Sequence, residues 1–335
     1  MSIRVGIVGI AGYGGGETLR YLCQHPQFKL VYAAGESTAG QRVGDRYPGV
    51  PLDLGNLVIE KFDPTSIDNV DLLFTSLPTG ASREPLALVG RNVTIVYIGG
   101  DHRYVPGWTY GLADAWPDDI RGKTRIANPG CYPAASLTPL APLLANGLIS
   151  PNNIIIDAKS GVSGAGRGGD NSKFGYAEVN EDFTVYGLLK HTHMPEITAT
   201  IDRLTHAAAK PNAGEPAAST GLVFTPHLVP QTRGILATVY ARGTATTEQC
   251  LAAARSYYAD RPFVRVTDKP PHTKWTTGSN LAFISYAADP ARELVIALCA
   301  IDNLGKGAAG QAIQNANLIC GLPEDMGLNV APLWP

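Results

Sequence analysis

The sequence predicts an α/β protein, with a Rossmann-type doubly wound sheet followed by an α+β domain that has a mostly antiparallel sheet. Three observations support this prediction. Residues 3–9 form an apolar run that ends in a glycine-rich turn. Residues 70–77 and 93–98 are also unbroken apolar runs, which is typical of parallel strands covered on both faces. Beyond residue 131, the apolar segments alternate or are rich in β-branched residues, and long loops separate them.

The first elements predict one βαβ unit. Two apolar extended segments, residues 3–9 and 28–34, flank a segment at 16–24 whose apolar residues have helical spacing. In a parallel sheet, such a unit crosses over right-handed. The two apolar runs further along the chain supply two more buried strands, so the first 130 residues are expected to form the doubly wound sheet.

The remainder of the chain is predicted to contain strands, a surface loop and a final helix. The predicted strands are residues 154–156, 221–225, 235–240 and 294–301. Residues 208–220 are small, polar and interrupted by prolines, as in a surface loop. The stretch 306–319 follows a strand and is expected to return as a helix to the first domain. We therefore predict a first domain of residues 1–130 with the C-terminal helix 305–335, and a second domain of residues 131–304.

Composition and charge narrow the class of function. A chain of 335 residues suits two domains better than one core. With a net charge of −2 and mixed signs, we expect no binding to nucleic acid or to an anionic membrane. No apolar run approaches the roughly 20 residues needed to cross a bilayer. Five scattered cysteines, without a CxxC pair, indicate reduced thiols and a cytoplasmic protein. Small molecules are the expected partners.

The glycine-rich turn Gly9–Gly16 predicts a dinucleotide site. It follows the first strand, opens the first helix and has the pattern GxxGxxG. Missing side chains let the backbone approach a pyrophosphate, and the helix N-terminus supplies N–H groups and a positive dipole. The alternative is a tight connection that binds nothing. The predicted contacts are Gly9, Gly12, Tyr13, Gly14 and Gly15.

The residues after the second predicted strand bear on the choice of dinucleotide. Glu36 favours NAD, because a carboxylate there bonds the ribose 2′-hydroxyl. Ser37, Thr38 and Arg42 favour NADP, because hydroxyls and a guanidinium can receive a 2′-phosphate. The residues alone leave both cofactors open.

Cys131 is the candidate nucleophile. It follows Gly130, which permits close approach of a ligand, and Pro133 suits the first turn of a helix. A thiol at a helix N-terminus is favoured as the thiolate, which attacks carbonyl carbon. Pro139 and Pro142 are expected to shorten or kink this helix. The alternative is an inert core cysteine, which is how the other four cysteines are interpreted.

His191 and His193 are the candidate acid and base. Alternate residues of an extended segment face the same side, so both imidazoles could enter one site. Histidine transfers protons near neutral pH. A metal site is not predicted, because no further acidic ligand has clear spacing. A structural role for one of the two histidines is the alternative.

Two further segments can bind anions. The loop Ser160–Arg167 can present successive N–H groups and a guanidinium to an oxyanion or phosphate, or it can be a flexible linker. Arg233 can hold a substrate carboxylate with two hydrogen bonds, or it can be a surface arginine.

These segments together resemble N-acetyl-γ-glutamyl-phosphate reductases, the NADPH-dependent enzymes of arginine biosynthesis, over nearly the whole chain. Several distinct motifs recur in the family's order. They include Gly9-x-x-Gly12-Tyr13-x-Gly15-x-Glu17, Pro129-Gly130-Cys131-Tyr132-Pro133, the Ser160–Arg167 loop, His191-x-His193-x-Pro195-Glu196-Ile197 and Asp302-Asn303-Leu304-x-Lys306-Gly307.

The resemblance implies roles for individual residues. Ser37 and Thr38 match the family's 2′-phosphate contacts, which favours NADP(H) as the cofactor. Asn303 and Lys306 match a turn beside the nicotinamide. The other residues predicted to bind are Ser163 and Gly164 for the cofactor, and Asn128, Arg103, Arg167, Glu196 and Arg233 for the substrate. The family habit also implies a homodimer or a homotetramer.

One segment departs from the family. Its members carry Ser-(Ala/Gly)-Asp-Phe-Arg-Leu, then a longer stretch before Tyr-Gly-Leu. Here Gly99-Gly100-Asp101-His102-Arg103-Tyr104 runs almost directly into Tyr110-Gly111-Leu112. A shorter rim predicts a wider mouth, so a different or carrier-linked acyl phosphate is the alternative substrate.

The predicted reaction is the NADPH-dependent reduction of an acyl phosphate, foremost N-acetyl-γ-glutamyl phosphate, to the semialdehyde and phosphate. Cys131 would hold the acyl group as a thioester, which accepts hydride far better than a carboxylate does. Two alternative classes of function are a dinucleotide-sensing protein and a cysteine hydrolase that uses no cofactor. A sensor would not need Cys131 and the two histidines, and a hydrolase would not need the glycine-rich turn.

Overall fold

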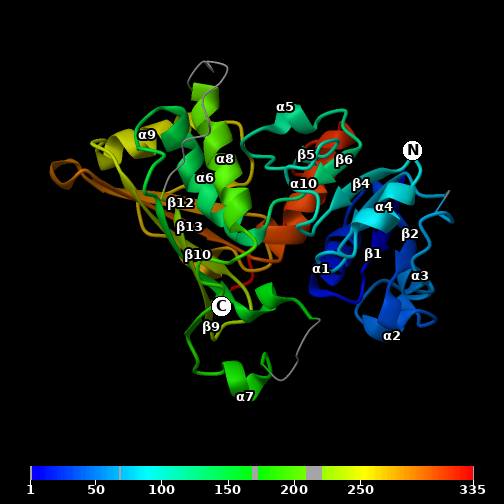
Figure 1. Cartoon of the computed structure of the whole chain (residues 1–335). Helices are drawn as coiled ribbons and strands as arrows, with labels where there is room; N and C mark the ends of the chain where they lie inside the picture. The colour runs from blue at the N-terminus through cyan, green and yellow to red at the C-terminus, as the bar shows by residue number, and fades with distance from the viewer. Residues whose placement is uncertain (1, 68, 168–172, 209–220, 335) are drawn as a thin grey trace. The chain divides into compact units, whose positions relative to one another are not determined.

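A computed structural model describes residues 2–67, 69–167, 173–208 and 221–334, apart from the side chains of 206–208 (Figure 1). The chain divides into two compact units. The first consists of Met1–Gly130, Gly166–Gly169 and Ala308–Val330, and the second of Cys131–Ala165, Asp170–Gly307 and Ala331–Pro335. The predicted surface loop at 208–220 lies outside the described residues, except for residue 208, the last of a helix.

The first unit is built on a parallel sheet with the strand order β2-β1-β3-β4-β6-β5 in the described part of the chain. Every pair of neighbouring strands in it is parallel. The strands are β1 (Ile3–Val8), β2 (Phe28–Ala34), β3 (Leu72–Thr75), β4 (Thr94–Tyr97), β5 (Thr109–Tyr110) and β6 (Arg125–Ala127). The helices are α1 (Tyr13–Leu22), α2 (Val43–Arg46), α3 (Leu52–Gly55), α4 (Arg83–Leu88), α5 (Pro117–Ile120) and α10 (Gly310–Ile319), with a 3₁₀ turn η1 (Glu36–Thr38). The doubly wound sheet predicted from the apolar runs is confirmed.

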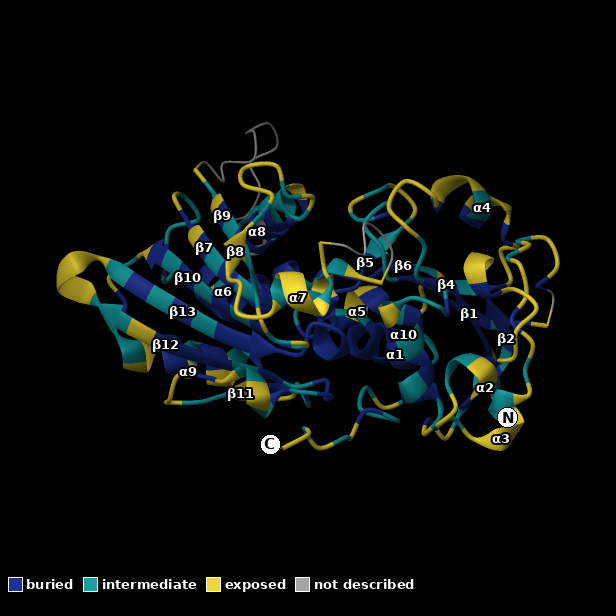
Figure 2. Ribbon diagram, turned by 90° about the horizontal axis from the view of Figure 1, so that it is seen from below, coloured by how far each residue is buried: buried dark blue, intermediate teal, exposed yellow. Residues whose placement is uncertain are grey.

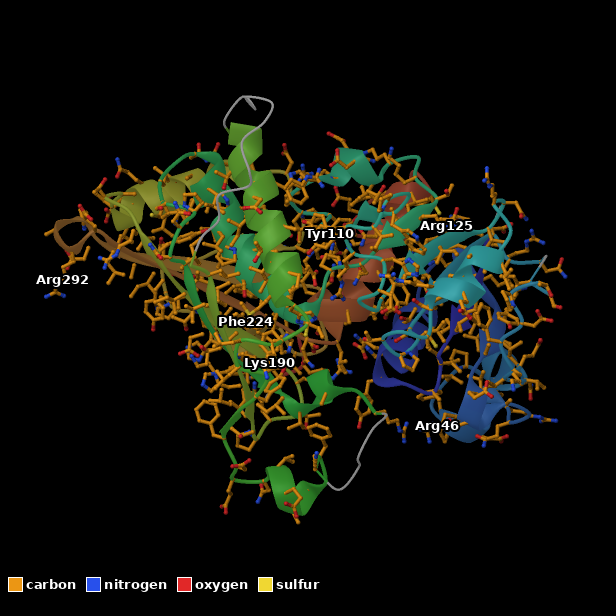
Figure 3. All side chains as sticks on the ribbon, viewed as in Figure 1. Arg46, Tyr110, Arg125, Lys190, Phe224 and Arg292 are labelled. Atoms are coloured by element: carbon orange, nitrogen blue, oxygen red, sulfur yellow. The ribbon has the colours of Figure 1, made fainter. Side chains whose placement is uncertain are left out.

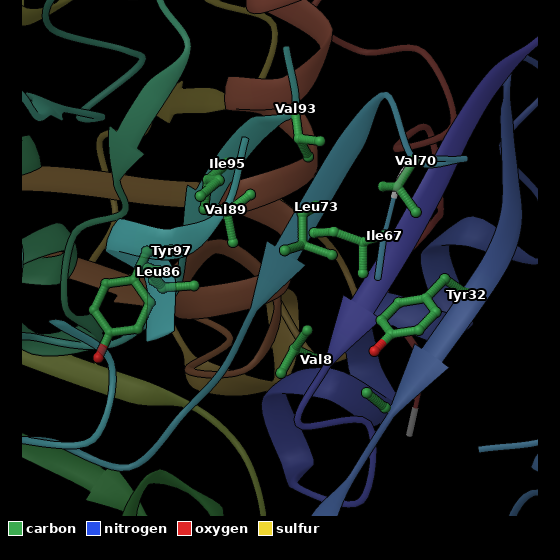
Figure 4. Packing of buried hydrophobic residues seen from close by; sticks show 11 residues of the cluster. Val8, Tyr32, Ile67, Val70, Leu73, Leu86, Val89, Val93, Ile95 and Tyr97 are labelled. Carbon is green, nitrogen blue, oxygen red and sulfur yellow. The ribbon is translucent and has the colours of Figure 1, made fainter. Parts of the chain in front are cut away.

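Buried apolar side chains pack between the strands of this sheet and the segments that connect them (Figure 4). Leu73 and Ile95, on neighbouring strands, are fully buried, and Leu86 of α4 packs against them. The turn after β1 lies at the topological switch point of the sheet. The order of the strands reverses there, because β1 pairs with β2 on one side and with β3 on the other. The carboxyl ends of strands at such a switch point form the crevice in which dinucleotides bind in α/β sheets.

The second unit contains a mixed sheet whose strand order, among the described residues, is β11-β12-β13-β10-β7-β9-β8. Only β11 with β12 and β7 with β9 are parallel pairs there, so the prediction of a mostly antiparallel sheet is confirmed. The strands are β7 (Ile155–Gly161), β8 (Thr184–Val185), β9 (Val223–Val229), β10 (Ile235–Arg242), β11 (Val264–Val266), β12 (Ala282–Asp289) and β13 (Leu294–Ile301). The helices are α6 (Cys131–Ala145), α7 (Tyr176–Val179), α8 (Met194–Ala208) and α9 (Thr247–Tyr257).

The second sheet is covered by helices on one face. Helix α6 lies beside α8 and α9 and contacts β10, β12 and β13 (Figure 1). Strand β10 accordingly alternates between buried residues such as Ala237 and Val239 and half-buried ones such as Thr238 and Tyr240 (Figure 2). The same alternation appears in β13, which pairs with β10 along its whole length.

The sequence suggested that Pro139 and Pro142 shorten helix α6. The helix instead continues through both prolines and extends over 15 residues. A proline has no N–H, so Pro142 leaves the carbonyl of Thr138 without its usual helical partner. The Tyr258 hydroxyl donates to that oxygen at 2.7 Å. A second tyrosine, Tyr286, donates to the carbonyl of Pro139 at 2.8 Å. The Tyr258 hydroxyl therefore replaces the hydrogen bond that Pro142 removes, and the Tyr286 hydroxyl adds a second bond to the next carbonyl of the helix.

Candidate active site

The glycine-rich turn has the geometry of a phosphate cradle. Gly9 adopts φ +83°, and a Cβ there would collide with the carbonyl oxygen of Ser76, while a Cβ at Gly15 would collide with the carbonyl oxygen of Gly9. A Cβ at Gly14 would lie 3.0 Å from Ser76 Oγ. The N-cap of α1 is Gly12, and the first N–H groups of a helix have no partner within it. The glycines let this turn pack closely against the Ser76 segment and against itself, and the helix N-terminus that follows fits a dinucleotide pyrophosphate.

Helix α1 begins at Tyr13, three residues earlier than the apolar spacing suggested. Glycines hide the start, since they contribute nothing to an apolar pattern. The Tyr13 side chain is 41% exposed, and the guanidinium carbon of Arg167 lies 6.0 Å from its ring centroid. The prediction that Tyr13 contacts cofactor and Arg167 substrate is not tested by this arrangement.

The segment after β2 separates the four residues considered for cofactor choice. Glu36 is exposed and forms an ion pair with Lys61 at 3.0 Å. Ser37 and Arg42 are exposed. Thr38 is 6% exposed, and its hydroxyl has no hydrogen-bond partner within the described residues. The two hydroxyls predicted to act together therefore differ in accessibility.

Cys131 is the first residue of α6, so its thiol lies at the N-terminus of a long helix, as predicted. The positive end of the helix dipole favours the thiolate. The backbone of Gly307 approaches this cysteine closely, since a Cβ on Gly307 would lie 2.8 Å from Cys131 Cβ. Gly307 belongs to a single π-helical turn, Gly305–Ala309, and its N–H donates to the carbonyl of Asp302 at 2.9 Å. Such turns occur frequently at functional sites.

His191 and His193 lie together, with ring centroids 4.8 Å apart. The ring of Tyr132, the residue after Cys131, lies edge-on to His191 at 5.6 Å and 6.0 Å from His193. The structure therefore brings both predicted acid–base residues to the ring of Tyr132, the sequence neighbour of the predicted nucleophile. Phe224, on β9 (Figure 3), packs at right angles to His191 at 5.2 Å.

The two histidines differ in their hydrogen bonding. The backbone N–H of His193 donates to Nδ1 of His191 at 3.1 Å. A neutral His191 therefore carries its proton on Nε2. Burial among aromatic rings lowers the pKa of His191 below its ordinary value, which keeps the ring neutral near pH 7.

Two tyrosines that sequence reasoning missed complete this cluster. Tyr186 donates its hydroxyl proton to Tyr132 Oη at 3.2 Å, and Tyr132 donates to the carbonyl of His227 at 2.8 Å. Burial raises the pKa of both tyrosines well above the ordinary value, so both stay neutral. Tyr132 was quoted within a motif but given no role. The sequence around Tyr186 gave no signal for a functional residue. The apolar residues that follow it, Leu188 and Leu189, are exposed and form no core pattern.

Asp302 organises the turn next to Cys131. Its carboxylate is fully buried and accepts hydrogen bonds from Arg233 Nη1 at 3.2 Å, Gly278 N at 2.6 Å, Leu304 N at 2.8 Å and Gly305 N at 3.0 Å. Arg233 retains 23% side-chain exposure while it is held by this carboxylate. A guanidinium fixed in this way is suited to binding an anion. Asp302 could have been found from the sequence, because it opens one of the quoted motifs.

The other predicted residues of the second unit also lie around this turn. The Asn303 amide accepts from Gly234 N at 2.7 Å and donates to Ser163 Oγ at 2.8 Å. A Cβ at Gly164 would lie 3.5 Å from Asn303 Nδ2. Lys306 is 1% exposed, with Nζ 5.4 Å from the ring centroid of Phe263. Asn303 thus ties the Ser163 loop to the turn that packs on Cys131.

The predicted substrate residues differ in burial. Asn128 is fully buried, and its amide donates to the Ala308 carbonyl at 3.1 Å and accepts from Asn315 Nδ2 at 2.9 Å. This gives Asn128 a structural role between β6 and α10. Arg103 is half-buried, and Glu196 of α8 is 4% exposed. The predictions that these residues bind substrate remain predictions.

The described residues show neither a metal-binding cluster nor a membrane-spanning helix. They contain no cluster of three or more His, Cys, Asp or Glu side chains placed to hold a metal ion. Among them there is also no helix with the length and apolarity to span a membrane.

Comparison with known proteins gives the chain two family matches. Residues 4–123 match the semialdehyde dehydrogenase NAD-binding domain, and residues 131–303 match the semialdehyde dehydrogenase dimerisation domain. Proteins named N-acetyl-gamma-glutamyl-phosphate reductase from Bradyrhizobium sp. (strain ORS 278) and Methylobacterium sp. (strain 4-46) are 68% and 67% identical to this chain over 335 residues, which cover 100% of both chains in each case. A protein of the same name from Desulforudis audaxviator is 41% identical over 358 aligned residues, covering 99% of this chain and 100% of its own.

Solved structures show the same fold at low sequence identity. An aspartate semialdehyde dehydrogenase from Candida albicans, solved with NADP, has a TM-score of 0.72 at 16% identity and covers 95% of this chain and 98% of its own. Aspartate semialdehyde dehydrogenase II from Vibrio cholerae has a TM-score of 0.70 at 18% identity, with the same coverage.

Proposed function

Because the chain belongs to the N-acetyl-γ-glutamyl-phosphate reductases within the semialdehyde dehydrogenases, we propose that it reduces N-acetyl-γ-glutamyl phosphate to the semialdehyde, with release of phosphate and with NADPH as reductant. One observation carries the mechanism: Cys131 is the first residue of a long helix, and the ring of the next residue, Tyr132, lies against both histidines.

Cys131 acts as the nucleophile. Its thiolate attacks the carbonyl carbon of the acyl phosphate, a C–S bond forms, and the C–O bond to phosphate breaks, so phosphate leaves and a thioester remains. Bound NADPH supplies the hydride that reduces the acyl group. The C–S bond then breaks, the aldehyde is released and the sulfur returns to the thiolate. The N-terminus of α6 favours the negative charge on sulfur at both ends of the cycle.

His193 exchanges a proton with the Cys131 sulfur, and His191 orients His193 through the hydrogen bond to its backbone. The Nδ1 atom of His191 accepts from the His193 backbone N–H, so His191 cannot accept a proton there without losing that bond. The lowered pKa of His191 also disfavours its charged form. His193 therefore takes the proton of the Cys131 thiol as the C–S bond forms, and gives a proton back to the thiolate after the aldehyde has been released.

The cofactor is held mainly by the glycine-rich turn. Gly9, Gly12, Tyr13, Gly14 and Gly15 bind the pyrophosphate, because they form the tight turn that leads into the N-terminus of α1, where unpaired N–H groups and the helix dipole favour negative charge. For the 2′-phosphate we propose the exposed Ser37 and Arg42 together with Thr38, whose buried hydroxyl has no hydrogen-bond partner within the described residues.

The contacts to nicotinamide and substrate belong to the same proposal. Ser163, Gly164, Asn303 and Lys306 bind the nicotinamide half. The substrate contacts are Arg103, Asn128, Arg167, Glu196 and Arg233. Among the latter, Arg233 is best supported, since a buried carboxylate fixes it while part of its guanidinium stays accessible.

The short segment between Arg103 and Tyr110 does not require another substrate. Relatives that match this chain over 335 residues at full coverage carry the same name as relatives aligned over 358 to 363 residues. The unusual length is thus compatible with N-acetyl-γ-glutamyl phosphate, and we favour that substrate over a bulkier or carrier-linked one. Comparing kcat/KM of N-acetylglutamate semialdehyde with longer analogues, in the reverse reaction with NADP and phosphate, checks this choice.

The second unit is proposed to join copies of the chain. Its matched family is described as a dimerisation domain, and the face of its sheet away from α6 carries half-buried apolar residues such as Leu236 and Ile296. A homodimer, or a homotetramer built from it, would cover this face. The molar mass in solution tests this, and a monomer at micromolar concentration would contradict it. We place the enzyme in the cytoplasm, in keeping with its five free cysteines.

The decisive experiment is Cys131→Ala. The variant should lose reductase turnover and keep the NADPH affinity of the wild type, because the thiol serves acyl transfer and not cofactor binding. Cys320→Ala is the matched control, since Cys320 is also half-buried but has a pKa raised to about 11 by burial. Steady-state turnover of Cys131→Ala above background would rule out the thioester mechanism.

A further inference from the structure

A buried polar cluster joins the loops that follow β3 and β4 in the first unit. Ser82 Oγ lies 2.6 Å from Asp101 Oδ2 and 3.1 Å from His102 Nε2. Asp101 also accepts from Tyr97 Oη at 3.0 Å and from the Gly80 N–H at 2.8 Å. Ser82 is fully buried and His102 is 5% exposed. Because of this burial, the cluster is not a serine nucleophile site, although it contains Ser, His and Asp.

The direction of these hydrogen bonds follows from proton counting. The carboxylate of Asp101 can only accept, so the single hydroxyl proton of Ser82 is donated to it. The Ser82 oxygen must then accept from His102 Nε2–H. Burial alone would raise the pKa of Asp101, but the hydrogen bonds from Ser82, Gly80 and Tyr97 outweigh it and leave this pKa below its ordinary value. The chain of donors His102 to Ser82 to Asp101 therefore ends on a charged acceptor.

The ring of His102 is fixed on its other sides by aromatic residues. It stacks on Trp108 at 4.0 Å and 25°, and lies edge-on to Tyr97 at 5.0 Å and 86°. Burial is the main reason that the pKa of His102 is lowered, with Arg83 adding to the effect and Asp101 opposing it. Stacking and the bond to Ser82 together leave the ring one orientation.

The neighbouring residue, Arg103, follows this ring directly in the sequence. Arg103 Nε donates to the carbonyl of Asn128 at 3.0 Å, three residues before Cys131 in the sequence. Two backbone hydrogen bonds of this loop are long, Arg103 N to Gly100 O at 3.4 Å and Val105 N to His102 O at 3.3 Å. The bonds of Ser82 to Asp101 at 2.6 Å and to His102 at 3.1 Å are shorter attachments of the loop.

We propose that His102, through Ser82 and Asp101, is the residue that positions Arg103 for binding the acyl phosphate. The inference rests on the proposed function and adds to it. In the shortened segment of this chain, the bond to Ser82 anchors the loop, and Arg103 is a substrate residue whose place is set by its neighbour.

Kinetics of five proteins test the proposal: the wild type, His102→Phe, His102→Gln, Ser82→Ala and Arg83→Ala. His102→Phe keeps the stacking but loses the donor, whereas His102→Gln keeps a donor at the position of Nε2. Arg83 provides the control, because it is exposed and donates to the Asp101 backbone carbonyl at 3.2 Å without taking part in the contacts of Ser82 with Asp101 and His102. We expect KM for the acyl phosphate to rise by about tenfold in His102→Phe and Ser82→Ala, with kcat and KM for NADPH within about twofold of the wild type. His102→Gln and Arg83→Ala should resemble the wild type.

Hydrogen exchange provides a readout that needs no substrate. The amides of Arg103, Val105 and Trp108 should exchange faster in His102→Phe than in the wild type, and at the wild-type rate in His102→Gln. An unchanged KM in folded His102→Phe, an equal loss in His102→Gln, or unchanged exchange of these amides would overturn the proposal. Failure of the wild type itself to reduce N-acetyl-γ-glutamyl phosphate would instead refute the proposed function, and the exchange rates would still decide the role of His102.

Discussion

Adding one methyl group at Gly307 should disable the enzyme without unfolding it. In Gly307→Ala, the new Cβ would lie 2.8 Å from Cys131 Cβ and 3.3 Å from both Cys131 Cα and the Asp302 carbonyl oxygen. Carbon atoms in contact normally lie about 3.5 to 4.0 Å apart. The overlap is therefore roughly 1 Å, and it falls on atoms next to the backbone that cannot rotate away.

The loss of stability and of rate in Gly307→Ala can be estimated from the segments that must shift to make room for the methyl group. Either the N-terminus of α6 or the turn after β13 must shift by about the overlap, because Asp302 pins the turn with bonds to Leu304 and Gly305. Overpacking by a methyl group in a close-packed site costs about 1 to 3 kcal/mol of stability. A displacement of about 1 Å at the reacting group can lower the rate by about a hundredfold. We expect kcat to fall by about a hundredfold and the free energy of unfolding to fall by about 1 to 3 kcal/mol.

The assay pairs steady-state kinetics with alkylation of the Cys131 thiol by iodoacetamide and with urea unfolding. Gly49→Ala is the matched control, because a Cβ there meets nothing within 4 Å. The alkylation rate reports on the thiol directly and does not depend on the identity of the substrate. A Gly307→Ala enzyme with wild-type kcat and wild-type alkylation rate would refute the reasoning, since it would show that the close approach has no consequence.

Three other outcomes are expected. NADPH should have a higher kcat/KM than NADH, because Ser37 and Arg42 are exposed while Lys61 engages the Glu36 carboxylate; equal use of NADH would contradict this. His193→Asn should lower kcat more than His191→Asn does, because only His193 is assigned the proton transfer, and the reverse order would exchange the two roles. Burial lowers the pKa of His25, so the unfolded chain binds more protons than the folded chain does below about pH 6.5. The contribution of His25 to the free energy of unfolding should therefore be constant above the unfolded pKa of about 6.5. Below that pH, it should fall by up to about 1.4 kcal/mol per pH unit. Urea titrations between pH 7.5 and 5 on the wild type and His25→Asn check this last slope, which should be shallower in the variant.

The parallel sheet was predictable because its strands are buried on both faces and need nothing but apolar residues. β1, β3 and β4 each fall within a predicted run. Strands β11 and β12 and helices α8 and α9 were not predicted. In β12, three consecutive residues, Ile284–Tyr286, are buried, which breaks the alternation that marks a one-sided strand. Packing against α9 and the neighbouring strands causes this burial, and such contacts leave no periodic signal in the sequence.

The residues with chemical roles were easier to find than the residues that hold them. Cys131 and the two histidines stand out because few other roles explain a cysteine after a glycine or two histidines in alternation. Their supports come from distant parts of the chain: Asp302 reaches Arg233 across 69 residues. A carboxylate at the end of an apolar strand can be noticed, but its partners depend on how the strands are ordered in the sheet.

Helix α6 shows how far this dependence extends. Two prolines within 15 residues are sound local grounds for expecting a shortened or kinked helix. At Pro142, the hydrogen bond that the helix loses is replaced by the Tyr258 hydroxyl, which donates to the Thr138 carbonyl from a position 120 residues away in the sequence. If this hydroxyl were removed, the carbonyl that Pro142 leaves unpaired would remain buried, at a cost of about 1 to 3 kcal/mol. The helix that begins at Cys131 is thus supported by a tyrosine that no local pattern connects to it.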